Sequence, residues 1–157
     1  MRDIYTMRPG IDSAGTPVLV TNFTGKRPRL SPDGRWLLFV AANSGRDEVY
    51  LRPYPNTGAA LFQLSTGGGG SASWSRDGRA ILYVSAANEL VQATVATDRT
   101  FTVTEQHPLF SLNSISNWDV TKDRDRFIVV HDRDGAQRAK LVVVENMFQE
   151  LQARVPR

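Results

Sequence analysis

The chain has 157 residues, of which 41% are apolar, and it contains no cysteine. This length suffices for one hydrophobic core of ordinary size, and the lack of cysteine excludes disulfides and thiol chemistry. The longest apolar run, residues 36–42, is too short to cross a membrane as a helix. The net charge of +3 is small, so a surface of mixed charges explains it without a nucleic-acid partner.

The first two predicted strands lie within residues 1–25. Residues 2–9 align with residues 46–53, 44 positions later, and the identical pairs are Arg2/Arg46, Asp3/Asp47, Arg8/Arg52 and Pro9/Pro53. Because residues 49–51 have the composition of a strand, the alignment predicts a strand near the N-terminus. Residues 17–21 form the second predicted strand, so this segment matches the last two strands of a longer unit.

A tight turn followed by a buried strand defines the next segment. In Ser31-Pro32-Asp33-Gly34-Arg35, proline fixes φ, aspartate can bond nearby backbone, and glycine accepts a left-handed conformation. Residues 36–41 are all apolar, too few for a typical helix, and bounded by turn residues. This pattern predicts a strand that is buried on both faces. Further strand-like runs follow at residues 49–51 and 61–64.

The turn and its strand recur twice, starting at residues 31, 75 and 121. The second copy, residues 75–84, keeps the aspartate and glycine, and strand-like runs follow it at residues 90–91 and 101–104. The third copy, residues 121–130, has Arg124 in place of the glycine, which predicts a looser or differently shaped turn. One more strand-like run closes this copy at residues 141–144.

Four short strands in about 40–45 residues are typical of one blade of a β-propeller. We therefore predict an all-β fold, a partial β-propeller of about three four-stranded antiparallel blades plus a half blade. The chain then forms a single propeller fragment, whose predicted parts are a half blade at 1–25, blades at 26–66 and 71–105, and a three-stranded blade at 114–145. The glycine-rich residues 66–71 between the first two full blades are expected to be a flexible connection.

The last residues change to a helical period. Met147, Phe148, Leu151 and Val155 fall on one helical face, Asn146 suits the N-cap, and Pro156 ends the helix. We expect a short C-terminal helix over residues 146–157 that packs against the sheet.

The sequence lacks the motifs of several familiar catalytic sites. No Gly-x-Ser-x-Gly elbow is present, the glycines at 67–70 are not followed by a phosphate-loop lysine, and the kinase loops are missing. We therefore expect no enzymatic activity and no cofactor. His131 with Asp132 and Asp134 is interpreted as part of a turn rather than a metal site, because the set lacks a recognised ligand spacing.

The candidate binding residues precede or begin the innermost strand of each predicted blade. In propellers these segments gather around one mouth of the central channel, and loops carry binding residues more often than framework strands do. The candidates are Lys26, Arg27, Arg29, Ser71, Asn117 and Trp118. Of the three tryptophans, Trp36 and Trp74 are expected in the core, and Trp118 is expected to be the more exposed.

Two segments resemble known repeats. Leu30-Ser31-Pro32-Asp33-Gly34-Arg35 and Trp74-Ser75-Arg76-Asp77-Gly78-Arg79 resemble the WD-repeat-like propeller repeats of TolB-like proteins, and residues 141–151 are similar to the closing segment of propellers fused to bacterial serine/threonine protein kinases. The resemblance implies a bacterial module that binds a protein or peptide, as a sensor or scaffold within a larger protein. It also implies a periplasmic or extracytoplasmic location, although a cytoplasmic one stays open.

Two other functions remain open. The chain could be the substrate-gating propeller of a prolyl-oligopeptidase-like or dipeptidyl-peptidase-like serine hydrolase whose catalytic domain lies elsewhere. It could instead bind an anion or a nucleic acid through Lys26, Arg27 and Arg29, although nucleic acid is the less favoured partner. Because an incomplete propeller exposes sheet edges, we also expect self-association or a missing half that completes the ring.

Overall fold

The computed structural model describes residues 2–97, 100–121, 126–131 and 140–144. Within these residues there are thirteen strands and no helix, so the predicted all-β class is confirmed. The predicted C-terminal helix and the turn at residues 122–125 lie outside the described residues. No helix of the described part is long and apolar enough to span a membrane. The chain divides into two compact units, Met1–Ser111 and Leu112–Arg157.

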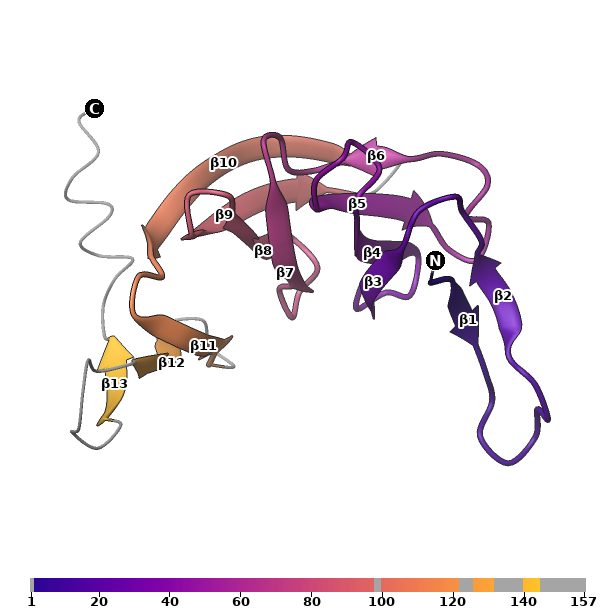
Figure 1. The fold of residues 1–157 in the computed structure, drawn as a ribbon, viewed down its shortest axis with the longest axis horizontal. Coiled ribbons are helices and arrows are strands. Elements are labelled where there is room, and N and C mark those ends of the chain that lie inside the picture. Colours follow the sequence, from indigo (N-terminus) through magenta and orange to yellow (C-terminus); the bar gives the residue numbers. More distant parts are fainter. Residues whose placement is uncertain (1, 98–99, 122–125, 132–139, 145–157) are drawn as a thin grey trace. The chain divides into compact units, whose positions relative to one another are not determined.

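The first unit contains three antiparallel sheets (Figure 1). The two-stranded sheet consists of β1 (Ile4–Thr6) and β2 (Thr16–Leu19). The second sheet has the strands β3 (Gly25–Leu30), β4 (Trp36–Ala41), β5 (Glu48–Pro53) and β6 (Phe62–Gln63). The third has β7 (Gly69–Trp74), β8 (Ala80–Ser85), β9 (Glu89–Ala96) and β10 (Thr102–Ser111).

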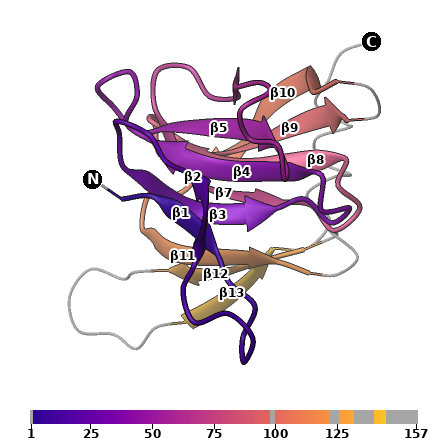
Figure 2. The ribbon, with the colours of Figure 1, turned by 90° about the vertical axis from the view of Figure 1, so that its right-hand side faces the viewer.

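Each four-stranded sheet follows the chain order, so every strand pairs with its sequence neighbour. Figure 2 shows the strands of both sheets stacked in the same order, with β3 and β7 at one end and β10 at the other. Because the first strand of one sheet contacts the first strand of the next, β3 and β7 lie side by side. This arrangement of consecutive four-stranded meanders is the repeat that the sequence predicts.

The core lies between successive sheets, and β4 contributes to it on both faces. Leu37 and Phe39 pack with Ile4 and Leu19 of the two-stranded sheet, together with Tyr50. The alternate residues of β4 form the other cluster, with side chains of the third sheet; its β4 members are Trp36, Leu38 and Val40. All six β4 residues are buried, as the apolar run predicts. Fully burying each large side chain contributes about 2 kcal/mol.

Aromatic rings fill the space between the second and third sheets. The ring centroids of Trp36, Phe62 and Phe101 lie 5.4 to 5.8 Å apart. The rings meet edge-on or tilted, which are the arrangements that aromatic pairs prefer. Trp36 is buried, as predicted. Trp74 is half-buried and packs against the same cluster, which agrees with its predicted core position.

The described residues of the second unit form one sheet, in the order β11 (Ile115–Val120), β12 (Phe127–His131) and β13 (Lys140–Val144). In β12, Phe127 and Val129 are each 2% exposed, whereas Ile128 and Val130 are each 41% exposed. Trp118 is half-buried and its ring lies 6.5 Å from that of Phe127. The sheet therefore has one buried face, and Trp118 is less exposed than its expected position implies.

Candidate functional site

The candidate site is a shelf formed by the bulges of β3 and β7. The pairing of β3 with β4 shifts register between Lys26 and Arg29, and that of β7 with β8 shifts between Gly70 and Ser73. In each bulge one residue has a positive φ, 53° at Arg27 and 48° at Ser71. These residues are 44 positions apart, so the same backbone distortion recurs in each four-stranded repeat. A positive φ at a residue other than glycine costs conformational free energy, and such residues are found preferentially at functional sites.

A hydrogen bond joins the two bulges. The Arg27 guanidinium donates through Nη1 to Oγ of Ser71, so the neighbouring sheets are tied together at the shelf. Both residues were candidates on sequence grounds, and the structure brings them into contact. A β-bulge changes the direction of the side chain that it carries. The two bulges therefore allow the side chains of Arg27 and Ser71 to meet.

The other two basic candidates of the shelf, Lys26 and Arg29, differ in whether an acidic side chain pairs with them. The Lys26 ammonium lies 2.9 Å from the Asp47 carboxylate and forms an exposed ion pair with it. The guanidinium of Arg29 donates to the carbonyl of Pro28, at 3.2 Å. Within the described residues, neither Arg27 nor Arg29 has an ion pair with an acid. The shelf therefore presents two uncompensated guanidinium groups on a strand that is exposed from residue 27 to residue 30.

A narrow groove adjoins the shelf on the side of β1. Its volume is about 140 Å³, and its walls come from β1, β3 and the segments beside them. Arg29 lines this groove together with apolar and aromatic side chains, among them Tyr5, Leu30 and Tyr54. A charged group and an apolar trough thus lie next to each other, which suits a segment that carries both an acid and an apolar side chain.

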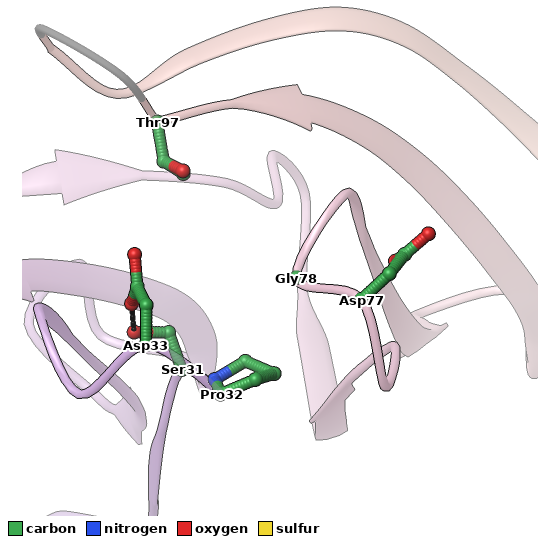
Figure 3. A pocket seen from close by; sticks show the side chains of 6 residues that line it. All are labelled: Ser31, Pro32, Asp33, Asp77, Gly78 and Thr97. Atoms are coloured by element: carbon green, nitrogen blue, oxygen red, sulfur yellow. Dashed lines mark hydrogen bonds between the residues drawn. The ribbon is translucent and has the colours of Figure 1, made fainter.

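A second hollow lies between the turns of the two full repeats. Its volume is about 300 Å³, and Figure 3 shows the side chains that line it, including Asp33, Asp77 and Thr97. The two carboxylates point in different directions in this view. Asp33 accepts from the Ser31 hydroxyl and from Arg35, and these contacts hold its pKa at about 2. Among the described residues no three His, Cys, Asp or Glu side chains come together as metal ligands would.

A buried carboxylate that the sequence analysis did not single out lies behind the shelf. Glu48 is 2% exposed; it accepts from the Ser65 hydroxyl and, at 2.7 Å, from the backbone amide of Gly68. Ser65 in turn accepts from the amide of Val49 at 2.8 Å. A charged residue directly before the apolar run at residues 49–51 is the signal that could have found it, because a buried charge needs partners. The network fixes the connection that leads into β7.

The remaining candidates belong to the other unit. Asn117 and Trp118 lie in β11, next to a register shift between Ile115 and Asn117. The side-chain oxygen of Asn117 accepts from the amide of Trp118 at 2.8 Å. A bulge in the first strand of the sheet therefore recurs here, as in β3 and β7. Of the six predicted residues, the structure brings Lys26, Arg27, Arg29 and Ser71 together in the first unit.

The comparisons with known proteins identify the fold. No protein-family model matches the sequence, and no curated protein matches it significantly. Among solved structures, an oligogalacturonate lyase from Vibrio parahaemolyticus is similar with a TM-score of 0.58 and 21% identity, over 76% of this chain and 34% of that one. TolB from Acinetobacter baumannii is similar with a TM-score of 0.60 and 18% identity, over 85% and 33% of the two chains.

A third solved structure, an oligogalacturonate lyase in complex with manganese, has a TM-score of 0.60 and 21% identity, over 87% of this chain and 39% of that one. The chain therefore spans about a third of the length of these proteins. TolB and oligogalacturonate lyase are both β-propellers, and the predicted fold class, a partial β-propeller, is confirmed. At such low identity the likeness concerns the fold alone.

One expectation is corrected by these comparisons. We predicted no enzymatic activity because hydrolase and kinase motifs are missing, but two of the similar structures are lyases. That prediction is wrong, because the missing motifs belong to hydrolases and kinases and their absence does not exclude a lyase. The fold of this chain also occurs in enzymes, so it does not exclude catalysis. The fusion to a protein kinase stays an expectation from sequence resemblance.

Proposed function

We propose that this chain is a β-propeller module that binds an acidic segment of a protein or peptide at the shelf of β3 and β7. The observation that carries the proposal is the pair of exposed guanidinium groups, Arg27 and Arg29, which have no ion pair with an acid within the described residues. Carboxylates match the fork of a guanidinium, which can donate two parallel hydrogen bonds to them.

The position of these groups favours an extended ligand. Arg27 lies in a bulge whose backbone conformation is disfavoured for a non-glycine residue, and its bond to Ser71 holds the side chain across two sheets. A guanidinium that is held in place loses less side-chain entropy when a ligand binds. The groove beside Arg29 accepts an apolar side chain one or two residues away from the bound acid.

A nucleic acid or another polyphosphate is the second candidate, and the charge of the same arginines favours it. The net charge of +3 and the ion pair of Lys26 with Asp47 leave a small basic surface, however, and the adjoining groove is apolar. Phosphate binding through several cations would weaken steeply with salt. A carboxylate ligand with apolar contacts should show a shallower dependence.

Calorimetric titration with two peptides of equal length tests the proposal. One peptide alternates acidic and aromatic residues, and the other has glutamine in place of every acid. We expect only the acidic peptide to bind. The double variant R27Q/R29Q should bind it about thirtyfold more weakly, because each of the two exposed charged hydrogen bonds contributes about 1 kcal/mol.

The matched control is R76Q/R79Q, which removes the same charge from exposed positions outside the shelf. This control should bind like the unmodified chain. Equal weakening in both double variants would show unspecific attraction to net charge and would refute the site. Tighter binding to a single-stranded oligonucleotide than to the acidic peptide, with a steep salt slope, would support the second candidate.

A further inference from the structure

Each sheet of this chain uses its two faces in a fixed way. In the sheet β3–β6, we call the face that packs on the two-stranded sheet the front face and the opposite one the rear face. The faces of the other sheets are named by the corresponding repeat positions. In the sheet β3–β6, Leu37, Phe39 and Tyr50 belong to the front face, because they pack with Ile4 of the two-stranded sheet. Leu38 and Val40 belong to the rear face, because they pack with Ile81 of the third sheet. Every contact between successive sheets in the first unit thus joins a rear face to a front face.

The two-stranded sheet has an apolar front face that no other sheet of the described part of the first unit covers. Ile4 of β1 pairs with Leu19. In the same way the carbonyl of Val49 in β5 accepts a hydrogen bond from the amide of Leu64, so Ile4 corresponds to Val49. The next residues, Tyr5 and Tyr50, therefore correspond as well. Tyr50 is 2% exposed and buried in the cluster at the front face of its sheet, but Tyr5 is 56% exposed. Other exposed apolar side chains of this sheet and its flanks are Met7 at 58% and Val20 at 64%.

The sheet of the second unit has an exposed apolar rear face. The repeated turns begin at Ser31 and Thr121, so Ile128 and Val130 occupy the positions of Leu38 and Val40. Leu38 and Val40 are at most 2% exposed because the next sheet covers them, whereas Ile128 and Val130 are each 41% exposed. The chain therefore exposes one rear face and one front face of the kind that pack together in its own core.

We propose that these two faces bind each other between copies of this chain, so that the face of Ile128 and Val130 in one copy packs on the face of Tyr5 in a second copy. The proposal commits to a second copy because the same sequence already makes this kind of contact between its own sheets, with the same residue types at the same repeat positions. The two faces differ, so the contact is head-to-tail and leads to a closed ring or to a longer assembly.

Light scattering behind size exclusion, at a chain concentration of about 100 µM, tests whether the full chain associates. We expect a species larger than the monomer. The variants Y5D and V130D each place a charge in one of the two faces and should each be monomeric. Because each variant keeps the other face intact, an equimolar mixture of Y5D and V130D should form a one-to-one complex that does not grow further.

Two controls make the result specific. I11D changes an exposed apolar residue on neither face and should associate like the unmodified chain. I128T is the milder change on the second face, and its circular dichroism should match that of the unmodified chain while its association is weaker. This variant keeps the proposal testable if V130D does not fold.

A monomeric unmodified chain would overturn the proposal. Association that survives in V130D or is not weakened in I128T would overturn it too, as would a mixture of Y5D and V130D that stays monomeric. Peptide binding at Arg27 and Arg29 can be measured on the V130D monomer, because Val130 lines neither the shelf nor its groove. The proposed function and this inference can therefore fail independently.

Discussion

At the scale of the residue, a serine hydroxyl closes each of the two complete turns of the repeat. Ser31 donates to the Asp33 carboxylate and accepts from the amide of Trp36 at 3.0 Å, and Ser75 makes the equivalent bonds with Asp77 and Ala80. The sequence analysis had assigned the turn to proline, aspartate and glycine. The serine was missed because its partners lie two and five residues away, and only the folded turn brings them together.

The Asp33 carboxylate gives a prediction about acid stability. The Ser31 hydroxyl and Arg35 hold its pKa at about 2, below the ordinary value of 3.8. A depressed pKa in the folded state stabilises the fold fully above pH of about 4, and this contribution is lost as the pH falls toward 2. We expect Asp33→Asn to lower the free energy of unfolding by about 1 kcal/mol at pH 7, since the carboxylate is 40% exposed and screened by solvent.

Urea denaturation of the unmodified chain and of Asp33→Asn at several pH values between 7 and 3 measures this contribution. The difference in unfolding free energy should shrink below pH of about 4. A difference that stays constant down to pH 3 would mean that the charge of Asp33 is not responsible.

At the scale of the element, burial sets the correspondence between strands. The identities Arg2/Arg46 and Asp3/Asp47 align Ile4 with Glu48 in the sequence. In the structure, however, the position equivalent to Ile4 is Val49, one residue further along the chain. Both of these residues are buried, and each has a leucine as its cross-strand neighbour. A slip of one residue exchanges the faces of a strand, so buried positions determine register more strongly than exposed identities do.

The connection between the second and third sheets is fixed rather than flexible. Gly67 and Gly68 have φ values of 86° and 116°, and Gly68 donates to the buried Glu48. A Cβ on Gly69 would lie 2.5 Å from the Ser65 hydroxyl oxygen, whereas one on Gly70 would meet nothing within 4 Å. The sequence could show the glycines but not the two side chains, Glu48 and Ser65, that make them necessary.

These two adjacent glycines form a matched pair for mutation. We expect Gly69→Ala to lower the free energy of unfolding by about 2 kcal/mol, because the added methyl group forces Ser65 away from Glu48. Gly70→Ala should change it by less than about 0.5 kcal/mol, as surface substitutions away from such contacts do. Thermal and urea unfolding measure both variants. Equal effects would show that the close approach at Gly69 is unimportant.

The outer strand of the third sheet is longer than the sequence indicates. The alternating run at residues 101–104 predicted a strand that ends at Thr104, but β10 continues to Ser111. It passes through Pro108, which pairs with Val91 at the edge of the sheet. Proline is tolerated in β10 because this strand ends the sheet and has a paired strand on one side only. From the sequence alone, such a proline predicts the end of a strand. The strand continues through Pro108 because β10 lies at the edge of its sheet.

At the scale of the whole molecule, repetition made the architecture predictable. Three copies of one turn and its apolar strand predicted consecutive meanders of short strands, and the described residues form them. The contact of Arg27 with Ser71 could not be predicted in the same way, because it depends on two bulges and on how β3 packs beside β7. The blade boundaries, the placing of Asn117 and Trp118 at a common site, and the ligand stay predictions.

The two smaller sheets of the described residues connect the fold to the proposed assembly. A sheet of two strands and a sheet of three strands each expose apolar residues at positions that are buried in the complete sheets. Exposed apolar faces of this kind mark interaction surfaces in soluble proteins. The self-association expected from the sequence is therefore retained as a proposal with a defined pair of faces.

Mapping the bound peptide on the chain by amide chemical shifts is the most direct test of the central claim. The monomeric V130D variant, which leaves the shelf and the adjoining groove unchanged, is labelled with ¹⁵N and titrated with the acidic peptide and then with its glutamine analogue. We predict the largest shifts within residues 26–30 and 69–74, and no comparable shifts with the analogue. Shifts that concentrate elsewhere, or a spectrum that the acidic peptide leaves unchanged, would contradict the shelf of β3 and β7 as a binding site.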